Sequence, residues 1–239
     1  MTDAATDGHL VDAAPARRPE RIALTGRHVA LRPLDPDADG ARLYPALHGP
    51  EREALWRYLS PSPFESEAGF LDYLRGLGAT PDPFAYAIAD PASGEPLGWL
   101  CLMRIEPAQR VVEVGNILFA PRLQRSPAAT EAVFLIAAHA FETLGYRRLE
   151  WKCDDLNEPS KRAALRLGFT YEGLFRQHMI VKGRSRDTAW FSMLEAEWPR
   201  RKLAFEAWLA PENFDAAGRQ RRSLADVREE GLSAAAAPR

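Results

Sequence analysis

Hydrophobic and polar positions follow two different periods along this chain, and these periods divide it into strands and helices. Three runs rich in β-branched and aromatic residues are predicted strands, namely Phe84–Ala89, 97–105 and Val111–Phe119. A turn-forming segment at 90–95 separates the first two, and a proline-containing turn separates the second two. Because both connections are short, we expect the three strands to form an antiparallel meander.

The longest helical pattern covers residues 126–144, where apolar residues recur at a spacing of three to four. Ser126 suits the N-cap, because its side-chain oxygen can accept a free backbone N–H of the first turn. Pro127 suits the first helical position, where an N–H has no intrahelical partner. Gly145 is a typical residue for the end of a helix. The pattern therefore predicts a helix with a sharply defined N-terminus.

Shorter periodic segments complete the prediction on either side of this helix. A strand over 28–34 comes first, followed by helices over 39–47, 51–58 and 66–77. After the long helix come a strand over 147–153, a helix over 159–167, an extended segment over 169–181, a strand over 188–194 and an amphipathic helix over Trp198–Leu209. This order predicts an α/β (mixed α+β) fold. Its sheet would be mixed, mostly antiparallel, with about six to seven strands and helices on both faces.

Composition sets the expected domain organisation and excludes several classes of protein. The 239 residues are 46% hydrophobic, which is enough for one sizeable core. We expect a disordered lead over 1–20, one domain over 21–199, and an amphipathic helix with a flexible tail over 200–239. The net charge of -2 indicates no general attraction to nucleic acid or to a membrane. We expect a cytoplasmic protein, because the chain has only two cysteines, both in apolar runs. It also shows no apolar span and no leader peptide pattern.

The segment 115–145 carries the first candidate site. A predicted strand runs into the basic turn Arg122-Leu123-Gln124-Arg125, and the turn runs into the N-terminus of the long helix. A helix N-terminus has a partial positive charge and several unpaired N–H groups, so it suits an anion such as a phosphate. On this local pattern alone, the alternative is a turn that has only a structural role and binds no ligand.

Four short motifs, taken in order, resemble the GNAT superfamily of N-acetyltransferases, in the branch of the ribosomal-protein N-terminal-alanine acetyltransferases. The segment 27–33 resembles the opening strand of that family, and QRSPAATEA at 124–132 resembles its pyrophosphate loop. The others are the N-x-x-S and LGF segments at 157–160 and 167–169, and the closing pairs EG at 172–173, RD at 186–187 and EW at 197–198. The resemblance covers about 24–198 and departs from the family pattern at Pro127, which replaces a glycine, and at Ala164, which replaces a tyrosine.

The resemblance implies transfer of an acetyl group from acetyl-CoA to an amine, either a small molecule or a protein N-terminus, without a metal. It places the cofactor arm along Ile117, Leu118 and Phe119. The implied contacts of the diphosphate are Gln124, Arg125, Ser126, Ala128, Ala129 and Thr130. Asn157 and Ser160 are implied contacts of the cofactor arm, although both residues also suit a simple helix cap.

The implied reaction needs a base, because an ordinary amine is mostly protonated at neutral pH. Glu113 is the best candidate, since it lies among apolar strand residues where desolvation would raise its pKa. Glu150 and Asp154, on the strand after the long helix, are the alternative bases. A glutamate on the solvent face of an amphipathic strand is the competing interpretation. Ser160 is the candidate to assist the departing sulfur, because Ala164 stands where many relatives have the general acid. A packing role for Ser160 competes with this hypothesis.

Other functions stay open at this point. The departures at Pro127 and Ala164 fit a non-catalytic acyl-CoA-binding or interaction protein on the same scaffold. Basic clusters at 182–186 and 219–222 suggest nucleic-acid binding, but solvated surfaces are the simpler interpretation given the net charge. The helix Trp198–Leu209 either covers the sheet or pairs two subunits in a homodimer. The sequence does not identify the acceptor. Four aromatic residues either line the acceptor site or belong to the core: Trp56, Tyr58, Phe64 and Trp99.

Overall fold

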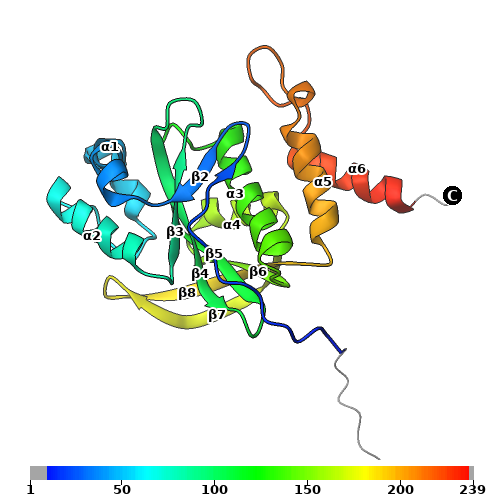
Figure 1. The fold of residues 1–239 in the computed structure, drawn as a ribbon, viewed down its shortest axis with the longest axis horizontal. Coiled ribbons are helices and arrows are strands. Elements are labelled where there is room, and N and C mark those ends of the chain that lie inside the picture. The colour runs from blue at the N-terminus through cyan, green and yellow to red at the C-terminus, as the bar shows by residue number, and fades with distance from the viewer. Residues whose placement is uncertain (1–9, 237–239) are drawn as a thin grey trace, which may run out of the picture.

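The strands predicted for the middle of the chain are the centre of an eight-stranded sheet (Figure 1). The structure is a computed structural model that describes residues 10–236. Strands β3 (Phe84–Ala89), β4 (Pro96–Glu106) and β5 (Val111–Phe119) pair antiparallel, so the meander is confirmed. The sheet has one strand more than the upper expectation, because the two-residue strand β1 (Leu24–Thr25) is too short to give a periodic pattern.

The strand order is β1-β2-β3-β4-β5-β6-β8-β7. β2 (Ala30–Pro33) joins β1 to β3, and β6 (Arg148–Asp154) runs parallel to β5. The hairpin of β7 (Thr170–Val181) and β8 (Arg184–Leu194) completes the sheet, with β8 antiparallel to β6 and β7 at the edge. The central β5–β6 pair is therefore the one parallel pair among the described strands.

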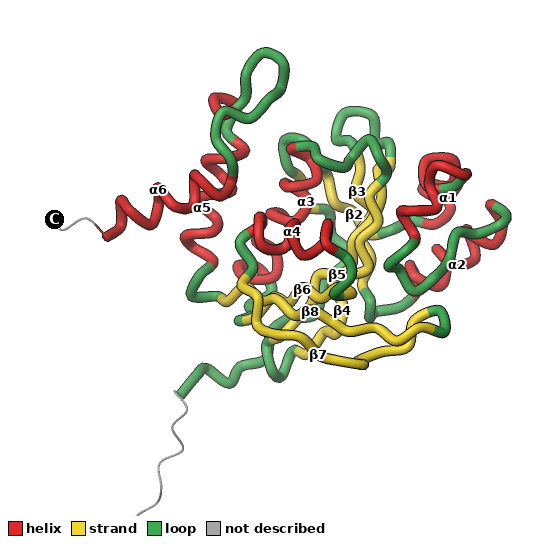
Figure 2. Tube along the Cα trace, turned by 180° about the vertical axis from the view of Figure 1, so that it is seen from behind, coloured by secondary structure: helices red, strands yellow, loops and turns green. Residues whose placement is uncertain are grey.

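Both faces of the sheet are buried, which explains why the central strands are almost continuously apolar in sequence. In β3, Tyr86 and Ile88 join one core cluster and Ala85 and Ala87 join the other. Figures 1 and 2 show the helices in two layers. One layer consists of α1 (Pro36–Leu47), the short helix η1 (Pro50–Trp56) and α2 (Glu67–Ala79). The other consists of α3 (Pro127–Ala138), α4 (Glu158–Leu167) and α5 (Trp198–Leu209).

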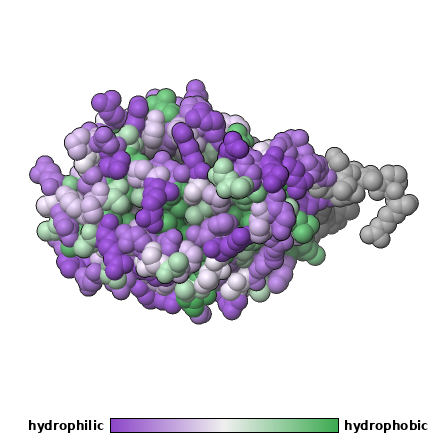
Figure 3. All heavy atoms as spheres, turned by 90° about the horizontal axis from the view of Figure 1, so that it is seen from above, coloured by the Kyte–Doolittle hydropathy of each residue, from purple (hydrophilic) through white to green (hydrophobic). Residues whose placement is uncertain are grey.

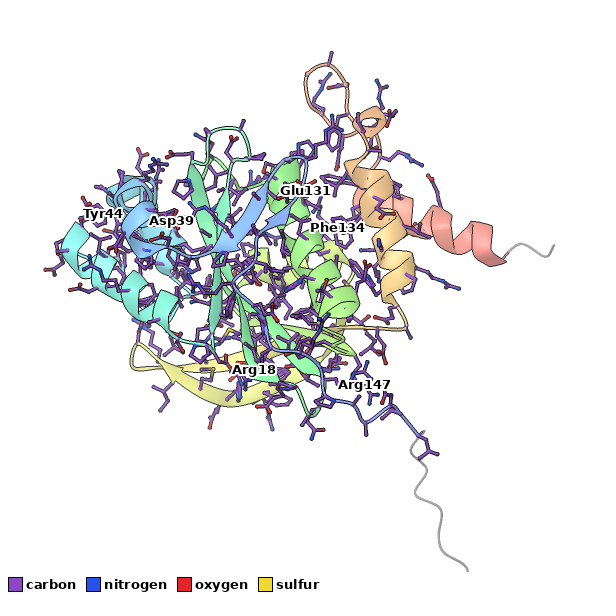
Figure 4. The ribbon with its side chains drawn as sticks, in the orientation of Figure 1. Arg18, Asp39, Tyr44, Glu131, Phe134 and Arg147 are labelled. Carbon is purple, nitrogen blue, oxygen red and sulfur yellow. The ribbon has the colours of Figure 1, made fainter. Side chains whose placement is uncertain are left out.

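Side-chain caps fix where the helices of the first layer begin. Ser66 caps α2, because its hydroxyl accepts the N–H of Gly69 at 3.2 Å. α1 begins three residues before the predicted start, since Asp35 accepts the N–H groups of Asp37 and Ala38. The fully buried Asp39 of α1 pairs with Arg32 of β2 and anchors the helix to the sheet (Figure 4). The segment predicted as a helix over 51–58 is the 3₁₀ helix η1.

Glu131 holds the second layer against the first strands of the sheet. The buried Glu131 carboxylate of α3 accepts three consecutive backbone N–H groups, those of Arg27, His28 and Val29, at 2.9, 2.6 and 3.0 Å (Figure 4). Gly26 makes this approach possible, because a Cβ there would lie 2.5 Å from the Glu131 carboxyl carbon. These contacts fix the position of α3 and therefore of its N-terminus.

The C-terminal part has more structure than the sequence suggested. α5 has the predicted bounds, with Trp208 and Leu209 buried and Leu203 exposed. The segment predicted as poorly ordered contains the short helix η3 (Pro211–Asn213) and α6 (Leu224–Ala236), where Leu224 and Val227 are buried. Only a few apolar residues anchor this part of the chain. In a charged and Ala-rich segment they are too few to produce a recognisable helical pattern in the sequence.

The N-terminal lead also has contacts with the body of the protein. Ala16 donates its N–H to Pro107 at 3.0 Å, and Arg17 donates its N–H to Leu144 at 2.8 Å. The expected disorder over 1–20 therefore does not describe this short stretch, and residues 1–9 lie outside the described residues. The face seen in Figure 3 is mostly polar, with small apolar areas between charged side chains. Within residues 10–236, no helix is both long and apolar enough to cross a membrane.

Candidate active site

The two parallel strands at the centre of the sheet separate after three residue pairs. β5 and β6 are paired at three registers, the last of which joins Glu113 to Glu150. Beyond that point β5 is paired with β4 and β6 with β8 among the described strands. The β4–β5 register also shifts there, and Asn116 has a φ of 46°, which marks a β-bulge. Backbone N–H and C=O groups of both strands are therefore free to face the gap.

A cavity of about 1410 Å³ opens at this gap. Its walls come from β5, β6, the N-termini of α3 and α4, the β7–β8 hairpin and the C-terminal part. The structure brings eleven of the predicted site residues together on these walls: Glu113, Ile117, Leu118, Phe119, Gln124, Arg125, Ser126, Ala129, Thr130, Asn157 and Ser160. Ala128 is absent from the lining, and its side chain packs against the core.

The N-terminus of α3 has the predicted cap. Pro127 is at the start of the helix, and the hydroxyl of Ser126 accepts the N–H of Ala129 at 3.2 Å. The N–H of Ala129 is thus used by the cap, and Thr130 lies where helical hydrogen bonding begins. The N–H of Ala128, in the first turn, and that of Ser126 remain for a ligand. Among Ser126, Ala128, Ala129 and Thr130, all expected diphosphate contacts, the first two therefore keep a backbone N–H outside the cap and the helical hydrogen bonds.

Glu113 lies where β5 and β6 separate, and its carboxylate is close to two positively charged side chains. Its side chain is 6% exposed, so the interpretation as a solvent-facing glutamate is wrong. Its Oε2 lies 2.9 Å from Arg104 Nε and 3.2 Å from Lys152 Nζ; these are ion-pair distances without hydrogen-bond alignment. Burial raises the pKa of Glu113, and the charges of Lys152 and Arg104 partly offset that rise.

Lys152 holds this cluster together. Its Nζ lies 2.7 Å from Glu150 Oε2 and 3.7 Å from the centroid of the Trp190 ring. Its side chain is 4% exposed, so the ammonium is placed between two buried carboxylates and an aromatic face. This arrangement keeps Glu113 in one position at the edge of the cavity.

The N-terminus of α4 places both predicted polar residues on the cavity wall. Asn157 is the N-cap, and its Oδ1 accepts the N–H of Ser160 at 3.2 Å. The Ser160 hydroxyl accepts from the indole N–H of Trp151 at 3.0 Å. Both residues thus have a structural role and also face the cavity. The nearby Cys153 is buried, and its burial raises the pKa of the thiol.

We expect Ser160→Ala to lower kcat by less than about tenfold, because the Ser160 hydroxyl is already oriented by Trp151 and a thiolate leaves without strong assistance. The loss of a hydrogen-bond acceptor for the indole should cost about 1 kcal/mol of stability. Steady-state kinetics and urea unfolding measure the two effects. A loss of kcat above a hundredfold with unchanged stability would instead identify Ser160 as the general acid.

The β7–β8 hairpin closes the other end of the cavity. Lys182 at its tip donates to the carbonyl of Trp56 at 2.8 Å, so the hairpin is tied to η1. Tyr58 lines the cavity and donates to the carbonyl of Leu156 at 2.8 Å. His178 also lines it, with its Nδ1 3.0 Å from the hydroxyl of Thr188. Of the aromatic residues left open by the sequence, Trp56 and Trp99 are fully buried core residues.

Sequence reasoning missed several residues of the site, above all Arg104 and His178. Both depend on strand pairings that have no local signature. Lys152 had a usable signal, because Glu150 and Lys152 are two apart on one strand and therefore share a face. Arg104 had none, since the register shift of the β4–β5 hairpin determines its approach to Glu113.

The cavity combines unpaired strand backbone, a helix N-terminus and a desolvated carboxylate, which are the parts that an acyltransferase using a long anionic thioester requires. Residues 28–170 match the family model described as the acetyltransferase (GNAT) domain. The chain belongs to the GNAT family and is an acetyl-CoA-dependent acetyltransferase.

Relatives agree with this assignment over most of the chain. A crystal structure of a GCN5-related N-acetyltransferase from Brucella melitensis is 47% identical, with a TM-score of 0.89, and the match covers 91% of this chain and 99% of that one. A second, described as a probable acetyltransferase of the GNAT family from Chromobacterium violaceum, is 40% identical, with a TM-score of 0.76 and coverages of 83% and 99%. The Bacillus subtilis protein named "Putative ribosomal N-acetyltransferase YdaF" is 26% identical, with coverages of 73% and 96%.

Proposed function

We propose that this acetyltransferase acts on an amine, by direct attack of the amine on the thioester, with Glu113 as general base. The observation that carries the proposal is the position of Glu113. It stands at the last paired register of β5 and β6, where its carboxylate is buried and also lines the cavity. A base at the mouth of the gap is within reach of both an acceptor and a group held between the strands.

The residues of the cavity fit acetyl-CoA. The gap exposes strand backbone from Val114 to Phe119, which suits the amide groups of an extended pantetheine arm. The N–H groups of Ser126 and Ala128 at the N-terminus of α3 suit the diphosphate. When bound, acetyl-CoA supplies an activated acyl group. A backbone N–H of β5 that faces the gap would stabilise negative charge developing on the acyl oxygen.

Glu113 would remove the proton that the attacking amine must lose. Its pKa is raised by burial, so the carboxylate is a stronger base than an exposed glutamate, while Lys152 and Arg104 favour its ionised form. The same cations keep protonated acceptor amines from forming a tight ion pair with Glu113. Direct transfer also agrees with the burial of Cys153 and the raised pKa of its thiol, since a covalent route needs a thiolate.

The acceptor would enter beside Tyr58, His178 and Lys182, where η1 and the hairpin meet. We propose a small-molecule amine or a protein N-terminus as the acceptor and the cytoplasm as the location. The name of the Bacillus subtilis relative specifies a ribosomal target, which favours a macromolecular acceptor over a small molecule.

A thiol-release assay with a panel of amines tests this function. The panel should contain a diamine, an aminoglycoside, free amino acids and short peptides with a free N-terminus, each against acetyl-CoA. We expect saturable, acceptor-dependent release of coenzyme A for at least one class. Release with an alcohol or thiol acceptor and with no amine would contradict the proposal.

A further inference from the structure

The wall of the cavity includes residues beyond the matched GNAT domain. The domain match ends at residue 170, but the side of the cavity next to α3 and α4 is lined by Trp208, Phe214 and the segment 218–220. Trp208 belongs to α5, and the others lie in the loop 213–222, which we call the C-terminal loop. This part of the chain therefore contributes directly to the ligand-binding cavity.

Internal hydrogen bonds give the C-terminal loop a fixed shape. The buried Asn213 donates from its amide to the carbonyl of Trp208 at 2.9 Å and accepts the N–H of Arg222 at 3.0 Å. Phe214 and Gln220 form an isolated β-bridge. Gln220 also accepts from the indole N–H of Trp208 at 2.9 Å. The loop is thus braced against α5 and presents a defined surface to the cavity.

Arg166 of α4 connects this loop to the first turn of α3. Its Nη1 donates to the Thr130 hydroxyl at 3.0 Å, and its guanidinium carbon lies 4.9 Å from the centroid of the Trp208 ring. Among the described residues, no carboxylate lies within ion-pair distance of Arg166. An arginine that lines a cavity without a carboxylate partner, next to a helix N-terminus, is available to an anionic ligand group.

Arg219 supplies a second guanidinium, from the C-terminal loop. Asp215 accepts from its Nε at 2.9 Å, which leaves the two terminal nitrogens of the fork for another anion. The Arg219 side chain lines the cavity and is 81% exposed. The loop surface near it is open, since a Cβ added at Gly218 would meet nothing within 4 Å.

We propose that the C-terminal loop and Arg166 bind the 3′-phosphate of coenzyme A. This inference rests on the proposed binding of the diphosphate at the N-terminus of α3. From there the gap between β5 and β6 takes the pantetheine arm, so the nucleotide end must leave on the other side, toward Arg166 and the loop. Two guanidinium groups are the side chains best suited to a phosphate dianion, because each can donate two parallel hydrogen bonds.

Calorimetric titration with coenzyme A and with 3′-dephospho-coenzyme A tests the proposal. We expect the unmodified protein to bind coenzyme A at least about tenfold more tightly than the dephospho form. Arg219→Ala and Arg166→Gln should each lower this ratio about threefold or more, with the affinity for the dephospho form nearly unchanged. Arg221→Ala is the matched control, because Arg221 is an exposed arginine of the same loop that does not line the cavity. Thermal melts of each variant show that the fold is retained.

Three results would overturn the inference. The unmodified protein could bind both ligands equally well, which would leave the cofactor assignment intact but remove the 3′-phosphate site. The ratio could stay the same in Arg219→Ala and Arg166→Gln, or fall as much in Arg221→Ala, which would exclude a specific role for the two arginines. If neither ligand binds the unmodified protein, the proposed function fails and this inference fails with it.

Discussion

Glu113→Gln is expected to lower kcat by about 10²- to 10⁴-fold, the usual contribution of a positioned general base. The amide has nearly the same shape but cannot take the proton from the amine. The acetyl-CoA KM should change little, because Glu113 lies at the acceptor side of the gap. Steady-state rates of thiol release, with acceptor and acetyl-CoA varied in turn, provide the measurement.

The pH dependence separates a catalytic role of Glu113 from a structural one. Glu113 acts as a base only when ionised, so kcat/KM should rise with pH through the pKa of Glu113, which burial raises above its ordinary value of 4.5. That rising limb should disappear in Glu113→Gln. Glu150→Gln is the matched control, since Glu150 shares the same lysine but does not line the cavity. An equal loss of activity in both variants would show that the charge cluster matters and the base does not.

Lys152→Met is expected to lower the free energy of unfolding by about 1.5 to 3 kcal/mol, because it removes the cation that two neighbouring buried carboxylates share, while Arg104 stays beside Glu113 and Arg148 beside Glu150. Glu113 and Glu150 occupy the same register of the parallel pair, so their charges repel one another once Nζ is gone. Methionine nearly preserves the volume and the contact with Trp190, which restricts the change mainly to charge. Urea unfolding at pH 8 measures the loss.

The sign of the pH effect provides a check on the Lys152→Met result. Without the lysine, the pKa of Glu113 in the folded state rises further above its unfolded value, so the native state binds more protons than the unfolded state. Stability should then recover as the pH falls from 8 toward 5, which is the opposite of ordinary acid destabilisation. Adding Glu113→Gln and Glu150→Gln to Lys152→Met should restore most of the lost stability at pH 8. A loss below about 1 kcal/mol in the single variant would mean that the cluster is effectively solvated.

The sequence predicted the parts of the site that depend on local pattern. The cap at Ser126 follows from residue type and position, and it forms as predicted. The desolvation of Glu113 follows from its apolar strand neighbours, and the structure confirms its burial. The meander β3–β5 follows from short connections between strongly apolar runs. Each of these features depends on residues that are close to one another in the chain.

The parts that could not be predicted depend on pairings between distant segments. The separation of β5 and β6 has no local signal in the sequence. Beyond the third residue pair, among the described strands, β6 is paired only with β8, which comes about thirty residues later in the chain. The approach of Arg104 to Glu113 depends on a register shift. The C-terminal loop has no local signal either, since it is held by the buried amide of Asn213, the hydrogen bond between Trp208 and Gln220, and a few apolar anchors. Local composition says nothing about such contacts.

Amide hydrogen exchange with and without coenzyme A tests the central claim most directly, because it reports which backbone groups the cofactor covers. The claim is that the cofactor lies between β5 and β6 with its diphosphate at the N-terminus of α3. Protection should increase at the amides of Gly115 to Phe119 that point away from β4, and at Ser126 and Ala128. Unchanged exchange at both segments at saturating coenzyme A, or protection confined to another part of the sheet, would contradict the account.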